Sequence, residues 1–315
     1  MGELGIALYE KVMDNMEKVI VGKRDVLTLI LTSLVAGGHV LIEDVPGTGK
    51  TKLAKALARS FDTDFSRIQF TPDLLPSDIT GLNVFDPKTG EFVLRKGPAF
   101  TNILLADEIN RATPRTQAGL LEVMEEGQIT IDGKCFELTS PFFVIATQNP
   151  VETAGTFPLP EAQLDRFMMK LSVGIPSHEQ ELEILEKYQA EDPLSSLEPV
   201  VTAEELLLVS REAQEVYVHP AVKDYIVRLA EGTRTSNDVL MGVSPRGSLS
   251  LMHAAKAYAC LMGASYCVPD HVKAVAPAVM VHRIILGYGK NTDCERFIQD
   301  VIKRTVVPTE DFNQR

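Results

Sequence analysis

The sequence predicts an α/β fold in which helices cover a parallel β-sheet, followed by a small all-helical domain. Short apolar segments alternate with helical patterns in the first part of the chain, an order that is typical of parallel sheets. Two connections read as β-hairpins, and beyond Thr202 the pattern is helical throughout. With 315 residues the chain is long enough for two domains. We place the boundary so that residues 1–190 form the sheet domain and residues 191–315 form the helical one.

Two helices are predicted before the first strand. Apolar residues between Leu8 and Ile20 recur at helical spacing, and the pair Val21-Gly22 ends this pattern. A second helix reaches Ala36. The most apolar window, residues 28–42, is broken by glycines and is too short to span a bilayer, so we expect this helix to lead into a buried strand.

Five short apolar segments predict the strands of the sheet. They are His39 to Glu43, Ser66 to Phe70, Ile103 to Ala106, Phe142 to Ala146 and Met168 to Val173. Parallel strands need a helix or a long crossover between them, and residues 52–58 have the composition of a strong helix. The alternation therefore predicts a parallel sheet.

Two interruptions of this order read as β-hairpins. The first covers residues 82–95 around the turn residues 86–90. The second covers residues 128–138 around Asp132-Gly133, a pair suited to a type I′ turn. Between them, Thr113-Pro114 is typical of a helix start. From the residues alone, covering the core and carrying a function are equally good interpretations of the hairpins.

The chain after the last strand continues as helices. Ser177 with Gln180 has the pattern of a capping box, and Thr202 with Glu205 repeats it. The segment 191–201 between them is rich in proline, serine and acidic residues, which makes it the predicted domain boundary.

A glycine-rich turn lies between the first strand and the helix at residues 52–58. Such a turn points backbone N–H groups at phosphate, and the helix dipole and the Lys50 ammonium add to the attraction. Thr51 adds a hydroxyl that can bind Mg²⁺. The pattern predicts an NTPase whose phosphate-binding residues are Pro46, Gly47, Thr48, Gly49, Lys50 and Thr51.

Asp44 departs from the literal phosphate-loop pattern, which has glycine at this position. Aspartate tolerates a positive φ better than most residues. We therefore expect the turn to form with the Asp44 carboxylate pointing away from the phosphates.

An acidic pair, Asp107-Glu108, follows the apolar segment 103–106. Two carboxylates directly after a buried strand have no packing purpose, and they suit a magnesium and water site. The pair strengthens the prediction of an NTPase with ATP and Mg²⁺ as cofactors.

Composition narrows the classes of partner. The formal net charge is −12, from 31 basic and 43 acidic residues, which argues against a general nucleic-acid or anionic-membrane binder. The four cysteines lie apart without Cys-x-x-Cys spacing, so we expect free thiols and no further metal site. The amino terminus lacks the pattern of a secretion signal, which predicts a cytoplasmic protein without membrane insertion.

The chain resembles the MoxR branch of the AAA+ ATPases, in the helix-2-insert lineage. The resemblance is carried by segments spread over nearly the whole length: residues 43–51, 107–112, 146–150, 159–167, 244–246 and 282–284. It implies an AAA+ P-loop core with two hairpin inserts and a helical lid. In this family, aspartate is an accepted residue at position 44.

The resemblance implies roles for the polar residues. Asp107 would orient Mg²⁺ through water, Glu108 would activate the attacking water as general base, and Asn149 would act as sensor 1 between the γ-phosphate and that water. Val21 and Gly22 resemble the segment that packs on adenine. Taken alone, residues 149–150 would read as a turn and residues 21–22 as the end of a helix.

Two arginines match the family's positions for charge stabilisation. Arg166 corresponds to the arginine finger and Arg246 to the sensor 2 arginine of the lid, and a guanidinium suits both roles because it stays charged and forks onto phosphate oxygens. Without the resemblance each would be interpreted as an ordinary surface arginine. Arg111 and Arg115 are rival candidates for a contact across a subunit boundary.

The resemblance also implies partners. It implies a homo-oligomeric ring, a hexamer. ATP hydrolysis by this ring would drive chaperone-like maturation, assembly or activation of a client protein complex. A partner protein would bear a von Willebrand factor A domain. The hairpin charges are mixed, which is unfavourable for binding a phosphate backbone and favours a protein client. The alternatives are a nucleic-acid motor of the same lineage and a nucleotide-gated scaffold with little turnover.

Overall fold

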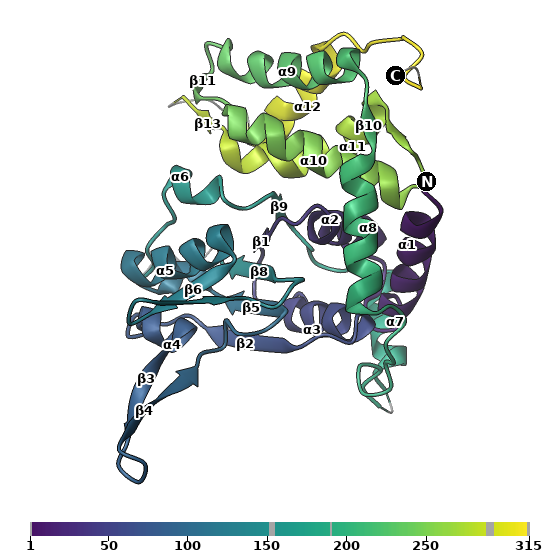
Figure 1. Ribbon diagram of the computed structural model, residues 1–315. Coiled ribbons are helices and arrows are strands. Elements are labelled where there is room, and N and C mark those ends of the chain that lie inside the picture. The colour runs from purple at the N-terminus through teal and green to yellow at the C-terminus, as the bar shows by residue number, and fades with distance from the viewer. Residues whose placement is uncertain (1, 151–154, 190, 288–292, 314–315) are drawn as a thin grey trace.

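The computed structural model describes residues 2–150, 155–189, 191–287 and 293–313 (Figure 1). Its centre is a five-stranded sheet with the order β2-β5-β8-β1-β9, in which every pair is parallel. The strands are β1 (Val40–Glu43), β2 (Phe65–Gln69), β5 (Ile103–Asp107), β8 (Phe143–Gln148) and β9 (Met169–Leu171). All five predicted strands are confirmed.

Helices cover both faces of the sheet. Alternate residues of a strand face opposite sides, and in β5 Ile103 and Leu105 contact one apolar cluster while Leu104 and Ala106 contact the other. The first cluster includes residues of α1 (Glu3–Met16), α2 (Arg24–Val35) and α3 (Lys50–Ser60), and the second includes residues of α5 (Pro114–Glu126). The central strands β1, β5 and β8 are therefore buried on two sides, which explains their apolar composition.

Both predicted hairpins are confirmed. The first pairs β3 (Gly81–Asp86) with β4 (Glu91–Lys96) and projects from the body beyond the short helix α4 (Pro76–Thr80) (Figure 1). The second pairs β6 (Gln128–Ile131) with β7 (Lys134–Glu137). The φ angles of 49° at Asp132 and 78° at Gly133 are those of a type I′ turn. Asn83 Nδ2 donates to Asp132 Oδ2 at 2.8 Å and links the two hairpins.

The C-terminal part is helical, as predicted. It contains α8 (Ala203–Glu215), α9 (Pro220–Arg234), α10 (Pro245–Leu261), α11 (Pro269–Met280), the 3-10 turn η2 (Val281–Arg283) and α12 (Cys294–Arg304). Two strand pairs were not foreseen: β10 (Tyr217–Val218) with β12 (Tyr266–Cys267), and β11 (Val239–Met241) with β13 (Ile285–Leu286). Strands of two or three residues are too short to show a period in the sequence.

Both predicted capping boxes form. The hydroxyls of Ser177 and Thr202 cap α7 (His178–Lys187) and α8. The segment between these helices is packed against the body, because the N–H groups of Val200 and Val201 both donate to the Ser60 carbonyl of α3. The boundary between residues 190 and 191 stays a prediction, and residue 190 lies outside the described part of the chain.

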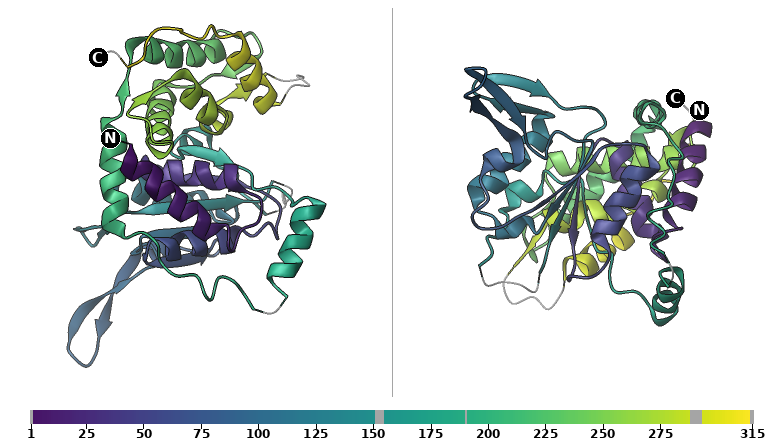
Figure 2. Two further views of the ribbon diagram at one scale, coloured as in Figure 1. Left: turned by 90° about the vertical axis from the view of Figure 1, so that its right-hand side faces the viewer. Right: turned by 90° about the horizontal axis from the view of Figure 1, so that it is seen from below.

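The N-terminal helices join the two parts of the molecule. Helices α1 and α2 lie between the sheet and the C-terminal helices, and both contact α8 and α10 (Figure 2). One apolar cluster runs from strand residues such as Val40 through Leu31 of α2 to Leu251 of α10. Among the described residues, no helix is both long and apolar enough to cross a membrane.

Candidate active site

The predicted phosphate loop connects β1 to α3. Gly47 and Gly49 have φ angles of 90° and 83°, and no atom lies within 4 Å of a Cβ built on either. Glycine is therefore required by the backbone conformation and not by crowding. No side chain caps the first N–H groups of α3, so they remain available to an anion. All six predicted loop residues line a cavity of about 680 Å³, a size typical of a small-molecule site.

The Lys50 side chain is folded over the loop. Its ammonium donates to the carbonyl oxygens of Asp44 and Val45 at 3.0 and 3.1 Å. These two bonds keep the positive charge within the loop, where phosphate oxygens would meet both the ammonium and the N–H groups of α3.

Asp44 is a structural anchor. Its buried carboxylate accepts hydrogen bonds from the Ser172 hydroxyl at 2.8 Å and from the N–H groups of Val173 and Gly174 at 2.6 and 3.2 Å. The expectation of a positive φ was wrong, because among the described non-glycine residues only Asp62, Glu108 and Asp132 have one. Aspartate replaces glycine here because it joins the start of the loop to the turn after β9.

Glycine at position 44 should therefore lower the stability of the folded protein. We expect Asp44→Gly to lower the free energy of unfolding by about 3 kcal/mol, because it leaves buried N–H donors without acceptors, each costing about 1–3 kcal/mol. Urea denaturation followed by circular dichroism measures this change. The control is Asp62→Gly at an exposed residue with a φ of 49°, where glycine relieves strain and no loss is expected. Equal midpoints for the two variants would contradict the anchor role.

The acidic pair lies at the end of β5. Asp107 is the last residue of the strand, and Glu108 follows with a left-handed φ of 56°. Thr147 of β8 binds both residues: its hydroxyl donates to Asp107 Oδ1 at 2.6 Å and accepts from the Glu108 N–H at 2.9 Å. Strand β8 thus stabilises the left-handed conformation of Glu108, in which both carboxylates line the cavity.

Strand β2 supplies further partners that the sequence analysis missed. Arg67 Nη2 forms an ion pair with Asp107 Oδ2 at 2.7 Å, and Gln69 Nε2 donates to Glu108 Oε2 at 2.8 Å. Arg111 Nη1 lies 3.1 Å from the same Glu108 oxygen. Arg111, a rival candidate for a contact across subunits, therefore contacts the Glu108 of its own chain. The other rival, Arg115, is exposed on the first turn of α5.

The oxygen donors in the cavity suit Mg²⁺. The Thr51 hydroxyl and the Asp107 carboxylate both belong to lining residues, and both are hard ligands of the kind this ion prefers. Among the described residues there is no cluster of three or more His, Cys, Asp or Glu side chains that would form a protein cage. This set fits an ion held mainly by phosphates and water, with one or two protein groups.

Part of the cavity lining is apolar. Val21 lines it together with Val173, Ile184 of α7 and Tyr188. The Tyr188 hydroxyl donates to the Val19 carbonyl at 3.0 Å, and Lys52 Nζ lies 3.5 Å from the centroid of the Tyr188 ring. The sequence analysis missed the role of α7, because its only local signal was a capping box.

The role of Gly22 beside the base stays a prediction. It lies next to the lining residue Val21 but is not itself part of the lining. Its carbonyl accepts from Gln180 Nε2 at 2.9 Å, and a Cβ on Gly22 would approach that nitrogen to 2.2 Å. The φ of Gly22 is 63°, a left-handed conformation that favours glycine.

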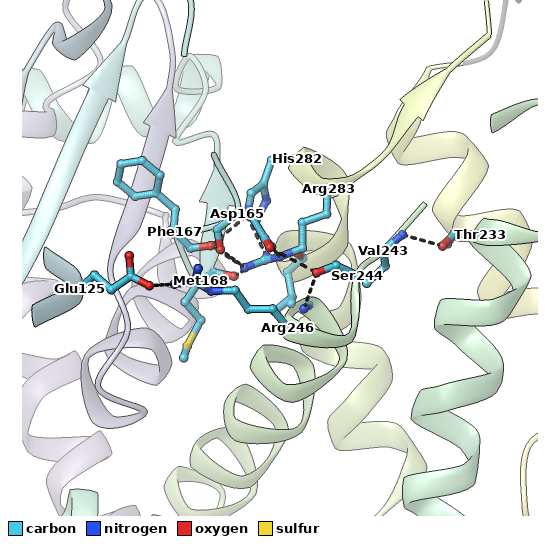
Figure 3. A network of polar contacts seen from close by, with 12 residues as sticks. Glu125, Asp165, Phe167, Met168, Thr233, Val243, Ser244, Arg246, His282 and Arg283 are labelled. Atoms are coloured by element: carbon cyan, nitrogen blue, oxygen red, sulfur yellow. Dashed lines mark hydrogen bonds and ion pairs between the residues drawn. The ribbon is translucent and has the colours of Figure 1, made fainter. Parts of the chain in front are cut away.

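Of the remaining predicted residues, Asn149 lines the cavity and the two arginines do not. Asn149, directly after β8, lines the cavity with the loop and the acidic pair. Arg166 and Arg246 do not line it; Arg166 Nε lies 3.1 Å from Glu125 Oε2, and Arg246 Nη2 lies 2.9 Å from Glu125 Oε1. Figure 3 shows Arg246 reaching Glu125 from α10. The two arginines thus converge on one carboxylate, away from the nucleotide cavity of their own chain.

Known proteins resemble the chain over nearly its whole length. Residues 39–169 match the model of the ATPase family associated with various cellular activities (AAA), and residues 231–304 match the AAA lid domain. The crystal structure of a "putative ATPase" from Cytophaga hutchinsonii superimposes with a TM-score of 0.90 at 36% identity, covering 98% of both chains. These matches confirm an AAA+ core followed by a helical lid.

Curated relatives carry the family name. The chain is 42% identical to Chaperone MoxR1 of Mycobacterium tuberculosis, over 90% of this chain and 77% of the relative. It is 30% identical to Protein MoxR of Methylorubrum extorquens, over 91% and 90% of the two chains. It is also 48% identical to the uncharacterized protein YeaC of Bacillus subtilis, over 96% of each. The chain with this nucleotide cavity is therefore an ATPase, and it belongs to the MoxR family of AAA+ proteins.

Proposed function

We propose that this protein is a Mg²⁺-dependent ATPase that assembles into a ring and uses ATP hydrolysis to mature, assemble or activate a client protein complex. One observation carries the proposal. The phosphate loop, the acidic pair and Asn149 share one cavity, while the two arginines suited to stabilise transferred phosphate lie outside it. Each cavity would be complete only when another chain supplies those arginines.

Within one chain the residues divide the chemistry. Lys50 and the first N–H groups of α3 bind the phosphates, and Thr51 and Asp107 would hold Mg²⁺, which neutralises phosphate charge. Glu108 accepts the proton of the attacking water, and Asn149 orients that water. Val21 and the other apolar lining residues would receive the base, with Gly22 shaping the adjacent backbone.

Between chains, Arg166 and Arg246 would act on the neighbour's phosphates. A head-to-tail contact between identical chains builds each site from two different chains and closes into a ring. We propose that the ring is a hexamer. Hydrolysis then depends on assembly, because an isolated chain has only part of the site.

The client is proposed to be a protein complex. The relative from Mycobacterium tuberculosis is named a chaperone, which supports a chaperone-like role here. The β3–β4 hairpin offers apolar surface, because the side chains of Phe85 and Phe92 are 51% and 72% exposed. Such residues suit contact with a protein rather than with a phosphate backbone. We further propose a cytoplasmic location and a partner with a von Willebrand factor A domain.

Nucleic acids should leave the ATPase rate unchanged. A net charge of −12 and apolar hairpin surface give little attraction to a phosphate backbone. The measurement is phosphate release at moderate salt, with and without duplex or single-stranded DNA and RNA, beside a titration of ATP binding. A several-fold stimulation that disappears as salt is raised would favour a nucleic-acid motor. ATP binding without phosphate release would favour a scaffold.

A further inference from the structure

A buried arginine of the lid, Arg283, binds the segment that carries Arg166 (Figure 3). Its side chain is 2% exposed, and its Nε lies 2.5 Å from Asp165 Oδ1. Its Nη2 donates to the carbonyls of Asp165 and Phe167 at 3.0 and 2.8 Å, and its Nη1 donates to that of Met168 at 3.1 Å. One guanidinium therefore fixes the backbone on both sides of Arg166.

The same carboxylate also fixes the helix that carries Arg246. The Ser244 hydroxyl donates to Asp165 Oδ2 at 3.2 Å. Ser244 is the N-cap of α10, and its Oγ accepts from the Gly247 N–H at 3.2 Å. Arg246 lies within this first turn. Asp165, which directly precedes Arg166, therefore binds both Arg283 and the cap of α10.

Helix α10 packs closely against this network at Gly247. A Cβ on Gly247 would lie 2.8 Å from Arg283 Cδ and 2.6 Å from Val243 Cγ1. Helix α10 therefore approaches the buried guanidinium at a distance that only glycine allows. The start of α10 therefore packs directly on the Arg283 side chain.

The residue before Glu125, the shared partner of Arg166 and Arg246, is bound by a histidine next to the sheet. His39, directly before β1, contacts the Met124 carbonyl through Nε2 at 3.0 Å, and its own carbonyl accepts from the Met168 N–H at 2.8 Å. The Val144 N–H donates to His39 Nδ1, so the ring is neutral, and burial lowers the pKa of His39 to about 4.

The exposed ion pairs with Glu125 do not determine where the arginines lie. The side chains of Arg166 and Arg246 are 30% and 48% exposed, and ion pairs of this kind contribute about 0–1 kcal/mol. The buried Arg283 makes an ion pair and several carbonyl contacts at once. A buried and fully bonded arginine is a rigid support.

We propose that Arg283 is a positioning residue that holds Arg166 of the core and Arg246 of the lid as one unit. The pair then reaches the neighbour's phosphate in a fixed geometry. This inference rests on the proposed function of Arg166 as an arginine that completes the neighbouring site. Arg283 itself contacts no nucleotide; it acts through the two arginines.

The first test is Arg283→Lys. Lysine keeps a charge for Asp165 but lacks the fork that reaches several carbonyls. A misplacement of about 1 Å at a reacting group costs about 10²-fold in rate. We expect phosphate release per site to fall about 10²-fold while the dissociation constant for ATP stays unchanged, because the cavity of the same chain is intact. Arg304→Lys, at an exposed position of α12, is the control and should change neither value.

Mixing experiments separate positioning from a general structural role. Arg283→Lys should regain activity when mixed with Glu108→Gln, because the Glu108→Gln chains supply an intact Arg166 in its correct position. Arg283→Lys should regain no activity when mixed with Arg166→Ala, because neither kind of chain in that mixture supplies a correctly positioned Arg166. Asp165→Asn, which keeps the shape and loses the charge, should give the same pattern if Arg283→Lys does not fold. Wild-type turnover in both variants, or failure to regain activity with Glu108→Gln in rings shown to be mixed, overturns the proposal for Arg283. If Arg166→Ala and Glu108→Gln do not complement each other, the proposed function of Arg166 fails instead.

Discussion

Glu108→Gln should bind ATP and keep it bound, while Lys50→Ala should bind nucleotide poorly. Glu108 faces the cavity from the end of β5 and would act on water only during the reaction, so its loss should slow phosphate release by about 10²- to 10⁴-fold without weakening binding. The Lys50 ammonium would contact phosphate in the ground state as well. A hydrogen bond to a charged group contributes about 1.5–3 kcal/mol, so affinity should fall roughly 10- to 100-fold. Titration with a fluorescent nucleotide, beside a phosphate-release assay, separates the two effects.

Matched controls are available elsewhere in the chain. Lys55→Ala on α3 and Glu122→Gln on α5 remove the same charges from exposed positions, and both should behave as the wild type. Normal turnover in Glu108→Gln would remove this residue from the role of general base. The interpretation of Lys50 would fail if its alanine variant bound ATP with unchanged affinity.

Two inactive variants, Arg166→Ala and Glu108→Gln, should recover activity when mixed. An arginine that completes a neighbouring site contributes about 10³- to 10⁵-fold in rate, so Arg166→Ala should look inactive while still binding ATP. In a randomly assembled equimolar ring, roughly a quarter of the interfaces would pair an intact Glu108 with an intact Arg166 from the next chain. Phosphate release from the mixture measures the recovery, and fluorescence transfer between labelled chains shows that subunits have exchanged.

The rival arginines provide the comparison. Arg111 contacts Glu108 of its own chain, so Arg111→Ala and Glu108→Gln damage the same half of the site and should not complement each other. Arg115→Ala should retain activity by itself. Complementation by either rival, with none from Arg166→Ala in exchanged rings, would transfer the role of Arg166 to that residue.

The parts of the site that follow from local sequence were predictable. A phosphate loop is a continuous segment with required glycines at Gly47 and Gly49, and the pair Asp107-Glu108 ends an apolar strand, so each has a pattern that can be read without neighbours. The five strands were predictable for the same reason.

The missed contacts depend on which strands become neighbours. Arg67 and Gln69 reach the acidic pair because β2 lies beside β5, and the Asp44 carboxylate is bound because β9 lies beside β1. The sequence contains the strands but not their order in the sheet. The convergence of Arg166 and Arg246 on Glu125 depends in addition on how the lid packs on the core, which no local pattern encodes.

The apolar cluster that runs from the sheet through α1 and α2 to α10 limits the movement of the lid relative to the core. Swinging the lid away from the core would expose part of that cluster to water, at a cost of about 25 cal/mol for each Å² of apolar surface. It would also break the buried ion pair between Asp165 and Arg283. We therefore expect the core and lid of a single chain to move together. In the proposed ring, movement driven by hydrolysis would therefore occur at the contacts between successive chains.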